Sequence, residues 1–215
     1  MADLFGTEPQ LAPDEPVGLG RMIAGGGPKA KRRANDFYPT PPDVTRALLR
    51  KEHHCIWAKA RDLPVWEPCG RGGAILRELQ AHGFDTVGTD IVADPDNHVA
   101  PLDLLQAKRR KGAAVVTNPP FALAEPMIIH LWDRLKVDYM ALLLKATYWN
   151  AGERAELFRR HRPARIYAVA WRPDFTGGGN PTMDVCWYVW QRQWPLGTQF
   201  SVLERHERAP ELGGI

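Results

Sequence analysis

The stretch PVWEPCGRGG, residues 64–73, joins a short apolar run to a glycine-rich turn, and a helical pattern follows from Ala74. In doubly wound α/β folds, such a turn at the carboxyl end of the first strand lets a nucleotide-like ligand approach the backbone and the helix N-terminus. The turn lacks the Gly-x-x-x-x-Gly-Lys-Ser/Thr pattern of a phosphate loop, which argues against ATP hydrolysis. The stretch therefore predicts an α/β fold with a nucleotide-type site at this turn.

Around this stretch, strand-like runs alternate with helical ones. The strand-like runs are residues 64–67, 86–90, 113–117, 139–145, 165–170 and 183–191, and the helical runs are residues 43–53, 74–82, 123–135 and 153–160. This alternation indicates crossover connections and a mostly parallel sheet with helices on both faces. A third strand is expected to end ahead of Asp103, which makes seven strands. A long Gly-rich segment without a helix signal precedes the last run, so we expect that strand to be antiparallel.

Composition sets the domain organisation. A chain of 215 residues with 44% hydrophobic and 25% charged residues fits one globular domain. Residues 1–34 are rich in Pro, Gly and charge, which predicts a disordered basic arm that could contact phosphates. Residues 35–192 form the expected domain, and residues 193–215 are expected to be a C-terminal tail too short for a recognition domain.

Several classes of protein are disfavoured. No apolar run approaches the roughly 18 to 20 residues of a membrane span, and the N-terminus lacks an apolar signal segment, so we expect a cytoplasmic protein without a membrane partner. Three widely spaced cysteines argue against a disulfide framework and a zinc site. The cluster His53-His54-Cys55 has no second half, so no metal is predicted. The net charge of +3 is compatible with a polyanionic partner.

Two acids follow the predicted strands. Asp90 ends the second strand, 18 residues beyond Gly72, near the spacing of a carboxylate that binds ribose hydroxyls. The alternative is a strand-end aspartate that caps the following turn. Asp103 follows the third strand and could either lie against a cofactor or cap a helix.

The fourth predicted strand runs into Asn118-Pro119-Pro120-Phe121. Two prolines stiffen this turn and remove two backbone donors, which leaves carbonyls and the Asn118 amide oxygen as acceptors. Acceptors aimed at the N–H bonds of an exocyclic amine would favour the pyramidal nitrogen of a transition state for alkylation. Phe121 would stack on a base flipped out of its helix. The turn predicts an amine-modifying catalytic loop.

With these motifs, residues from about Asp36 to Gln191 resemble the amino-methyltransferases that use S-adenosylmethionine (SAM), specifically phage and prophage DNA N6-adenine methyltransferases. The resemblance rests on the Asp36-Phe37-Tyr38-Pro39-Thr40-Pro41 segment, the turn at 67–73, Asp90, Asp103, the loop at 118–121 and their linear order. It implies a Rossmann-like class I SAM-dependent methyltransferase fold with an antiparallel last strand. One residue separates Pro68 from Gly70, where the family usually has two, which leaves open which amides meet SAM.

The resemblance also implies site roles and a location. It assigns catalysis to Asn118, Pro119, Pro120 and Phe121, and SAM binding to Phe37, Tyr38, Thr40, Pro41, Glu67, Gly70, Gly72, Asp90, Ile91, Asp103 and Asn118. The partner would be DNA, methylated at adenine N6 in the cytoplasm of a bacterium or a phage-infected host.

Arginines suggest where nucleic acid could bind. The segment after the fifth strand carries Arg154, Arg159, Arg160, His161, Arg162 and Arg165, which could contact phosphates or simply form a solvated face. Arg172 begins a long loop expected to be mobile and to close over the flipped base. Without a recognition domain, we expect a short or relaxed target sequence.

Three rival hypotheses remain. The same loop could serve methylation of an RNA base or of a protein glutamine. A non-enzymatic alternative is a decayed DNA-binding or anti-restriction module. Pro68-Cys69 also resembles the Pro-Cys nucleophile of cytosine C5-methyltransferases, but it lies inside the cofactor turn. The pattern leaves N6-adenine against N4-cytosine, the target sequence and the oligomeric state open.

Overall fold

The computed structural model describes residues 38–179 and 181–205. The expected arm, residues 1–34, and the predicted cofactor residue Phe37 lie outside the described residues. The helices are α2 (Pro42–Ala60), α3 (Ala74–Ala81), α4 (Ala124–Ile129) and α5 (Ala155–Arg160). The strands are β1 (Val65–Glu67), β2 (Thr86–Asp90), β3 (Val99–Pro101), β4 (Ala114–Thr117), β5 (Tyr139–Lys145), β6 (Arg165–Val169), β7 (Val185–Gln191) and β8 (Gln199–Leu203).

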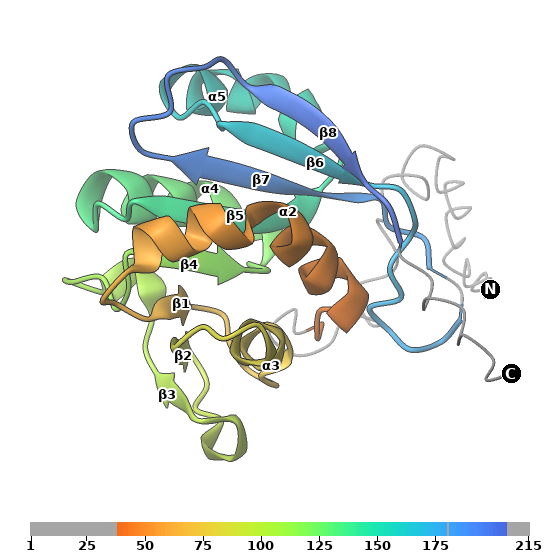
Figure 1. Ribbon diagram of the computed structural model, residues 1–215. Coiled ribbons are helices and arrows are strands. Elements are labelled where there is room, and N and C mark those ends of the chain that lie inside the picture. The colour runs from red at the N-terminus through yellow and green to blue at the C-terminus, as the bar shows by residue number, and fades with distance from the viewer. Residues whose placement is uncertain (1–37, 180, 206–215) are drawn as a thin grey trace, which may run out of the picture. The chain divides into compact units, whose positions relative to one another are not determined.

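The strands form one sheet in the order β3-β2-β1-β4-β5-β7-β6-β8 (Figure 1). All the paired neighbours are parallel except at β7, which is antiparallel to both β5 and β6. A mostly parallel α/β sheet with an antiparallel strand at residues 183–191 is therefore confirmed.

The strand count needs a correction. The described residues hold eight strands, because Gln199–Leu203, expected in a tail, pairs in parallel with β6 as β8. The strand, Gln-Phe-Ser-Val-Leu, is short, and of its three apolar residues Leu203 is buried whereas Phe200 and Val202 are exposed. The antiparallel strand β7 is consequently not the last one.

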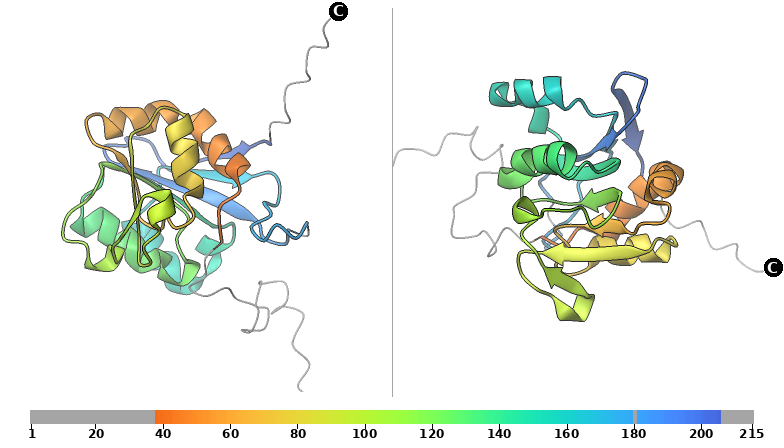
Figure 2. Two further views of the ribbon diagram at one scale, coloured as in Figure 1. Left: turned by 90° about the horizontal axis from the view of Figure 1, so that it is seen from below. Right: turned by 90° about the vertical axis from the view of Figure 1, so that its left-hand side faces the viewer.

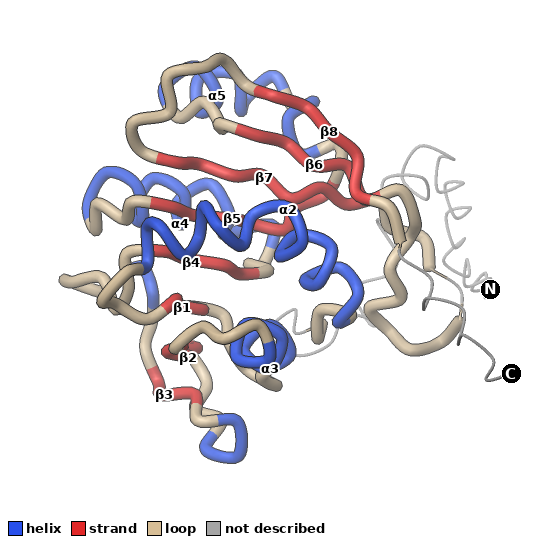
Figure 3. Tube along the Cα trace, in the orientation of Figure 1, coloured by secondary structure: helices blue, strands red, loops and turns tan. Residues whose placement is uncertain are grey.

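Helices cover both faces of the sheet (Figure 2). The alternation of side chains along the strands divides the core between the two faces. Along β4, Ala114 and Val116 face the cluster that includes α2 and α3, whereas Val115 faces the cluster that includes α4. Figure 3 shows α2 lying over the middle of the sheet, alongside β4 and β5. The strands in the middle are nearly all apolar, as expected of a sheet buried on both sides.

A buried ionic network fastens α2 to the sheet. Glu52 is 1% exposed, and its carboxylate lies 2.6 Å from Nε of Arg165 on β6. The hydroxyls of Tyr139 and Tyr167 also donate to Glu52. Arg165 was grouped above with arginines that could contact phosphates; this interpretation is wrong, because its guanidinium is buried against Glu52 and the ring of Trp194.

The sheet topology defines one functional edge. The carboxyl ends of β1, β2, β4, β5 and β6 point the same way, and we call this side the carboxyl edge. The chain proceeds from β1 toward β2 and β3, and then returns to place β4 on the other side of β1. Strand order therefore reverses between β1 and β4, which is where open α/β sheets bind ligands. None of the described helices has the length and hydropathy of a membrane span.

Candidate functional site at the carboxyl edge

The glycine-rich turn follows β1 at the reversal point. The N–H of Gly70 donates to the Thr89 carbonyl oxygen at 2.8 Å, and the N–H of Gly73 donates to the Gly70 carbonyl oxygen at 2.9 Å. Gly72 and Gly73 have φ angles of 79° and 61°, in the left-handed region that favours glycine. A Cβ on Gly70 would lie 3.2 Å from the Glu67 carbonyl oxygen. These glycines shape a tight turn between β1 and α3.

Two carboxylates accept the remaining amides of the turn. The Arg71 N–H donates to Asp90 Oδ2 at 3.3 Å, and the Gly72 N–H donates to Asp94 Oδ2 at 2.8 Å. The four N–H groups from Gly70 to Gly73 thus donate within the chain. The binding of SAM by Gly70 and Gly72 remains a prediction.

Asp94 was missed by the sequence analysis. The Gly72 amide and the Asn97 side chain, which donates at 2.9 Å, lower the pKa of Asp94. The available signal was the turn sequence Asp94-Pro95-Asp96-Asn97, which is typical of a side-chain-capped loop. Asp94 thus stays ionised and supports the glycine turn from the β2 side.

Asp90 lies at the end of β2, beside the turn. Its Oδ1 accepts the Val92 N–H at 3.0 Å and its Oδ2 accepts the Arg71 N–H, so the carboxylate is oriented by two loops. Each oxygen keeps a second lone pair for a hydroxyl donor. Ile91 next to it is 67% exposed. A fixed carboxylate beside an exposed apolar side chain can hold a nucleoside by its ribose hydroxyls and its base.

Asp103 caps a short helical turn, which is one of the two roles expected for it from the sequence. Its Oδ1 accepts the Leu105 N–H at 2.9 Å and caps the 3-10 turn Leu104–Gln106. A contact with a cofactor remains a prediction, since a capping carboxylate retains acceptor capacity.

The loop after β4 joins the predicted N-terminal segment. Asn118 Nδ2 donates to Thr40 Oγ1 at 3.1 Å, across 78 residues of sequence. Thr40 is 4% exposed and precedes α2, which begins directly after Pro41. With Nδ2 held in this way, Oδ1 of Asn118 is the atom left to accept hydrogen bonds, and no described residue donates to it. Tyr38 is half-buried at the start of the described chain.

The rest of this loop is rigid and partly apolar. Pro119 is buried, and the Pro120 carbonyl oxygen accepts the Leu123 N–H at 2.9 Å, closing the 3-10 turn Phe121–Leu123. Phe121 packs half-buried against the α4 side of the core. Nζ of Lys145, the last residue of β5, lies 5.5 Å from the Phe121 ring centroid. Lys145 was not singled out from the sequence, because its position depends on β4 and β5 being neighbours.

Cys69 is half-buried in the turn after β1. Burial raises the pKa of its thiol to about 12. A nucleophilic cysteine needs a lowered pKa and access to substrate. This environment argues against the covalent cytosine chemistry considered from Pro68-Cys69.

Glu67, at the end of β1, should make the stability of the fold depend on pH. Burial raises the pKa of Glu67 well above its ordinary 4.5, although the Leu76 N–H that donates to Oε2 at 3.1 Å opposes this. The folded state therefore holds this proton more tightly than the unfolded state, so stability falls as pH rises from about 4.5 toward the raised pKa. Glu67→Gln keeps the acceptor but cannot ionise.

We accordingly expect Glu67→Gln to be more stable than the wild type at pH 8, with a smaller difference at pH 5. Urea unfolding at both pH values measures this. Unfolding free energies that change in parallel with pH in the two proteins would contradict it.

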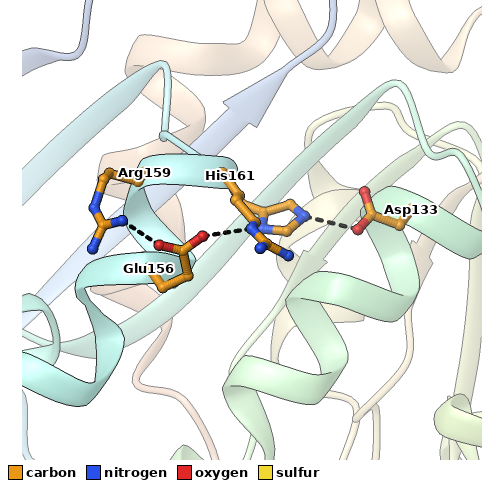
Figure 4. A network of polar contacts seen from close by, with 5 residues as sticks. Asp133, Glu156, Arg159 and His161 are labelled. Carbon is orange, nitrogen blue, oxygen red and sulfur yellow. Dashed lines mark hydrogen bonds and ion pairs between the residues drawn. The ribbon is translucent and has the colours of Figure 1, made fainter.

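The predicted nucleic-acid arginines have different surroundings. Arg159 and Arg160, in the last turn of α5, both pair with Glu156 in its first turn, and His161 contacts Asp133 (Figure 4). The last turn leads toward the amino end of β6, away from the carboxyl edge. Their contact with nucleic acid remains a prediction.

Arg154 and Arg172 follow β5 and β6 at the carboxyl edge. The Arg154 guanidinium lies 4.1 Å from the Tyr148 ring centroid and donates to the Tyr148 carbonyl oxygen. Arg172 pairs with Asp184 at 2.8 Å. The structure therefore brings Arg154 and Arg172 to the same edge as Asn118.

The loop between β6 and β7, expected to be mobile, folds around Asp174. Its carboxylate accepts the N–H groups of Thr176, Gly177 and Gly179. These hydrogen bonds, led by that of Gly179, lower the pKa of Asp174 to about 2. The described part of the loop is thus organised by one side chain.

In the part of the chain that the structure describes, no group of three His, Cys, Asp or Glu side chains could hold a metal ion. His53, from the histidine pair noted above, contacts the His82 carbonyl oxygen at 3.1 Å and packs on Phe84.

Comparison with known proteins places the fold. No protein-family model and no curated protein matches this sequence. A proposed RNA methyltransferase from Pyrococcus horikoshii superposes with a TM-score of 0.58 at 13% identity, over 77% of this chain and 89% of that one. A proposed class I SAM-dependent methyltransferase from Listeria monocytogenes gives a TM-score of 0.53 at 12% identity, over 86% and 71%. The chain has the class I SAM-dependent methyltransferase fold.

A further solved structure of this fold is the type IIG restriction endonuclease BpuSI, with a TM-score of 0.56 at 12% identity. The match covers 82% of this chain but only 27% of the endonuclease. Within this methyltransferase fold, the Glu67–Gly73 turn, Asp90 and Asn118 lie at the carboxyl ends of three adjacent strands, β1, β2 and β4.

Proposed function

We propose that this protein transfers a methyl group from SAM to the exocyclic N6 amine of adenine in DNA. The observation that carries the proposal is Asn118, whose amide orientation is fixed by Thr40 at the point where strand order reverses, beside the turn and acid suited to a nucleoside. Both halves of the reaction, a methyl donor and an amine acceptor, then meet at one edge of the sheet.

The residues present fit SAM. Asp90 would accept the ribose hydroxyls, Ile91 would contact the adenine, and the tight turn at Gly70 and Gly72 would let the ligand lie close to the backbone. Phe37, Tyr38, Thr40 and Pro41 would hold the methionine part of SAM. Glu67 and Asp103 would also line the SAM site. When bound, SAM supplies an electrophilic methyl group on a sulfonium.

The chain's own contribution to the chemistry is hydrogen-bond acceptance. The N6 lone pair of adenine is delocalised into the ring, so the amine is a poor nucleophile. Oδ1 of Asn118 and the Pro119 carbonyl oxygen would accept hydrogen bonds from the two N–H groups and favour a pyramidal nitrogen. This nitrogen would bond to the methyl carbon as the carbon–sulfur bond breaks, with S-adenosylhomocysteine as the leaving group. The methylated amine would then release one proton to water, and no strong general base is required.

The substrate assignment rests on aromatic and charged groups near Asn118. Phe121 would stack on a base that has left its helix, and Lys145 adds positive charge beside it. Arg154, Arg159, Arg160 and Arg172 are the proposed phosphate contacts, with those at the carboxyl edge nearest the chemistry. The segment 36–41 and the structural likeness to a restriction endonuclease favour DNA, whereas the likeness to a proposed RNA methyltransferase makes an RNA base the second candidate.

A labelling experiment decides between these substrates. Methyl-labelled SAM is supplied with unmethylated DNA, with RNA or with a protein extract, and incorporation into each is measured. We expect label in DNA. Label confined to RNA or to protein glutamine would replace the substrate assignment, and a protein that binds DNA but not SAM would support the decayed, non-enzymatic module.

Thr40 serves as a positioning residue in this account. Thr40→Val keeps the side-chain shape but removes the oxygen that accepts from Asn118, so the amide can rotate. We expect kcat to fall about tenfold, as for loss of one neutral hydrogen bond, with KM for DNA nearly unchanged. Thr40→Ser should restore most of the rate. Equal loss in the Ser and Val variants would show that Thr40 acts through packing alone.

A further inference from the structure

The eight tryptophans of the chain fall into two groups. Six are fastened within the fold by an indole hydrogen bond or a ring contact: Trp57, Trp66, Trp132, Trp187, Trp190 and Trp194. The side chains of Trp149 and Trp171 make neither kind of contact with any described residue. Both follow strands at the carboxyl edge, Trp149 after β5 and Trp171 after β6. Trp171 packs partly against the core, whereas Trp149 is 50% exposed.

The exposure of Trp149 is imposed by a rigid turn. Tyr148, beside it, is 3% exposed and its ring packs on those of Phe158 and Tyr188. The Arg154 guanidinium covers the Tyr148 ring at 4.1 Å and donates to the Tyr148 carbonyl oxygen at 2.9 Å. Because Tyr148 is anchored on several sides, Trp149 is held outward.

This turn adjoins the catalytic loop. Strands β4 and β5 are hydrogen-bonded neighbours, with Thr117 opposite Leu142, so the segments that follow them leave the sheet side by side. The 5.5 Å approach of Lys145 Nζ to the Phe121 ring joins the two segments, and Trp149 comes four residues after Lys145. Leu123, in the Phe121–Leu123 turn, is itself 42% exposed.

We propose that Trp149 stacks on a nucleic-acid base next to the nucleotide that enters the Asn118 site. The inference rests on the proposed function, because it requires a flipped base. Removing one base from a stack exposes the faces of its neighbours, and an indole can cover such a face whatever the base. The cations at the same edge, Lys145 and Arg154 among them, give the charge that a phosphate backbone requires.

The chain contains a matched control. Trp57 is 56% exposed, close to the value for Trp149, but it lies near the C-terminal end of α2 and packs on Phe84, which precedes β2. Trp57 is therefore at the opposite edge of the sheet. A contact that needs only an exposed tryptophan would make the two residues equivalent, whereas stacking beside the site makes them different.

The test measures binding of a fluorescein-labelled mixed-sequence DNA duplex by anisotropy, with S-adenosylhomocysteine present, for wild type, Trp149→Ala, Trp149→Phe and Trp57→Ala. We expect Trp149→Ala to weaken DNA binding about tenfold, Trp149→Phe to keep most of the affinity and Trp57→Ala to match the wild type. Stacking should also quench tryptophan emission on DNA binding, and this quench should be smaller in Trp149→Phe. Calorimetric SAM affinity should be equal in all four proteins.

The outcomes separate the two proposals. If the Trp149 variants bind DNA as tightly as the wild type and show the same quenching, the role of Trp149 is overturned. The proposed function still stands in that case if the wild-type protein methylates DNA. Trp149-dependent DNA binding without methyl transfer would support the contact and overturn the proposed function. Equal weakening by Trp149→Ala and Trp57→Ala would also overturn the inference.

Discussion

Asn118→Ala is expected to lower kcat for methyl transfer by about 100- to 1,000-fold, the range seen when one preorganised hydrogen-bonding group for a transition state is removed. The amide of Asn118 is held through Nδ2 by Thr40 at 3.1 Å, which aims Oδ1 as an acceptor. Alanine removes that acceptor while Pro119 and Pro120 keep the course of the loop. Because the lost interaction strengthens as the nitrogen becomes pyramidal, kcat should fall far more than KM for DNA rises.

Asn118→Asp provides the internal comparison, since a carboxylate retains an acceptor oxygen that Thr40 can still orient by donating its hydroxyl. It should be more active than Asn118→Ala. Single-turnover methyl transfer measures both variants, with SAM affinity by calorimetry and thermal unfolding as controls. A wild-type rate in a folded Asn118→Ala protein would remove Asn118 from the mechanism.

Arg165→Met should be the most destabilising of the changes considered. Arg165 lies 2.6 Å from Glu52, and both side chains are almost wholly buried. Replacing the guanidinium leaves the Glu52 carboxylate with neutral donors, among them the Tyr139 and Tyr167 hydroxyls. Breaking one side of a buried ion pair typically costs about 3–5 kcal/mol, because an uncompensated charge remains inside.

Urea unfolding measures this loss, and two further proteins sharpen it. Arg160→Met removes an exposed arginine paired with Glu156 and should change stability little. A double variant, Arg165→Met with Glu52→Gln, removes both charges and should recover part of the lost stability. An Arg165→Met protein as stable as Arg160→Met would show that the buried pair does not hold α2 on the sheet.

The parts of the structure that follow from local pattern could be predicted from sequence. Apolar runs that end at the glycine-rich turn, at an aspartate and at the Asn-Pro-Pro turn predict strand ends at Glu67, Asp90 and Thr117. These three strand ends do lie at one edge of the sheet. The capping role of Asp103 was foreseen as an alternative, because an aspartate before a short helical turn often accepts its amides.

The parts that depend on distant residues could not be predicted. Arg165 resembled a surface cation within a basic run, because Glu52, its partner, is 113 residues away. Strand β8 is exposed except for Leu203, and its pairing depends on the position of β6. The contact between Thr40 and Asn118, which orients the proposed acceptor, likewise joins residues 78 apart in sequence.

The central claim is that the loop at Asn118 directs the methyl group to an exocyclic amine. The most direct measurement is mass spectrometry of nucleosides from DNA incubated with the protein and deuterated-methyl SAM. The account predicts deuterated N6-methyldeoxyadenosine, formed at least about 100-fold more slowly with Asn118→Ala. Deuterated 5-methyldeoxycytidine, or label that persists unchanged in the Asn118→Ala reaction, would contradict it.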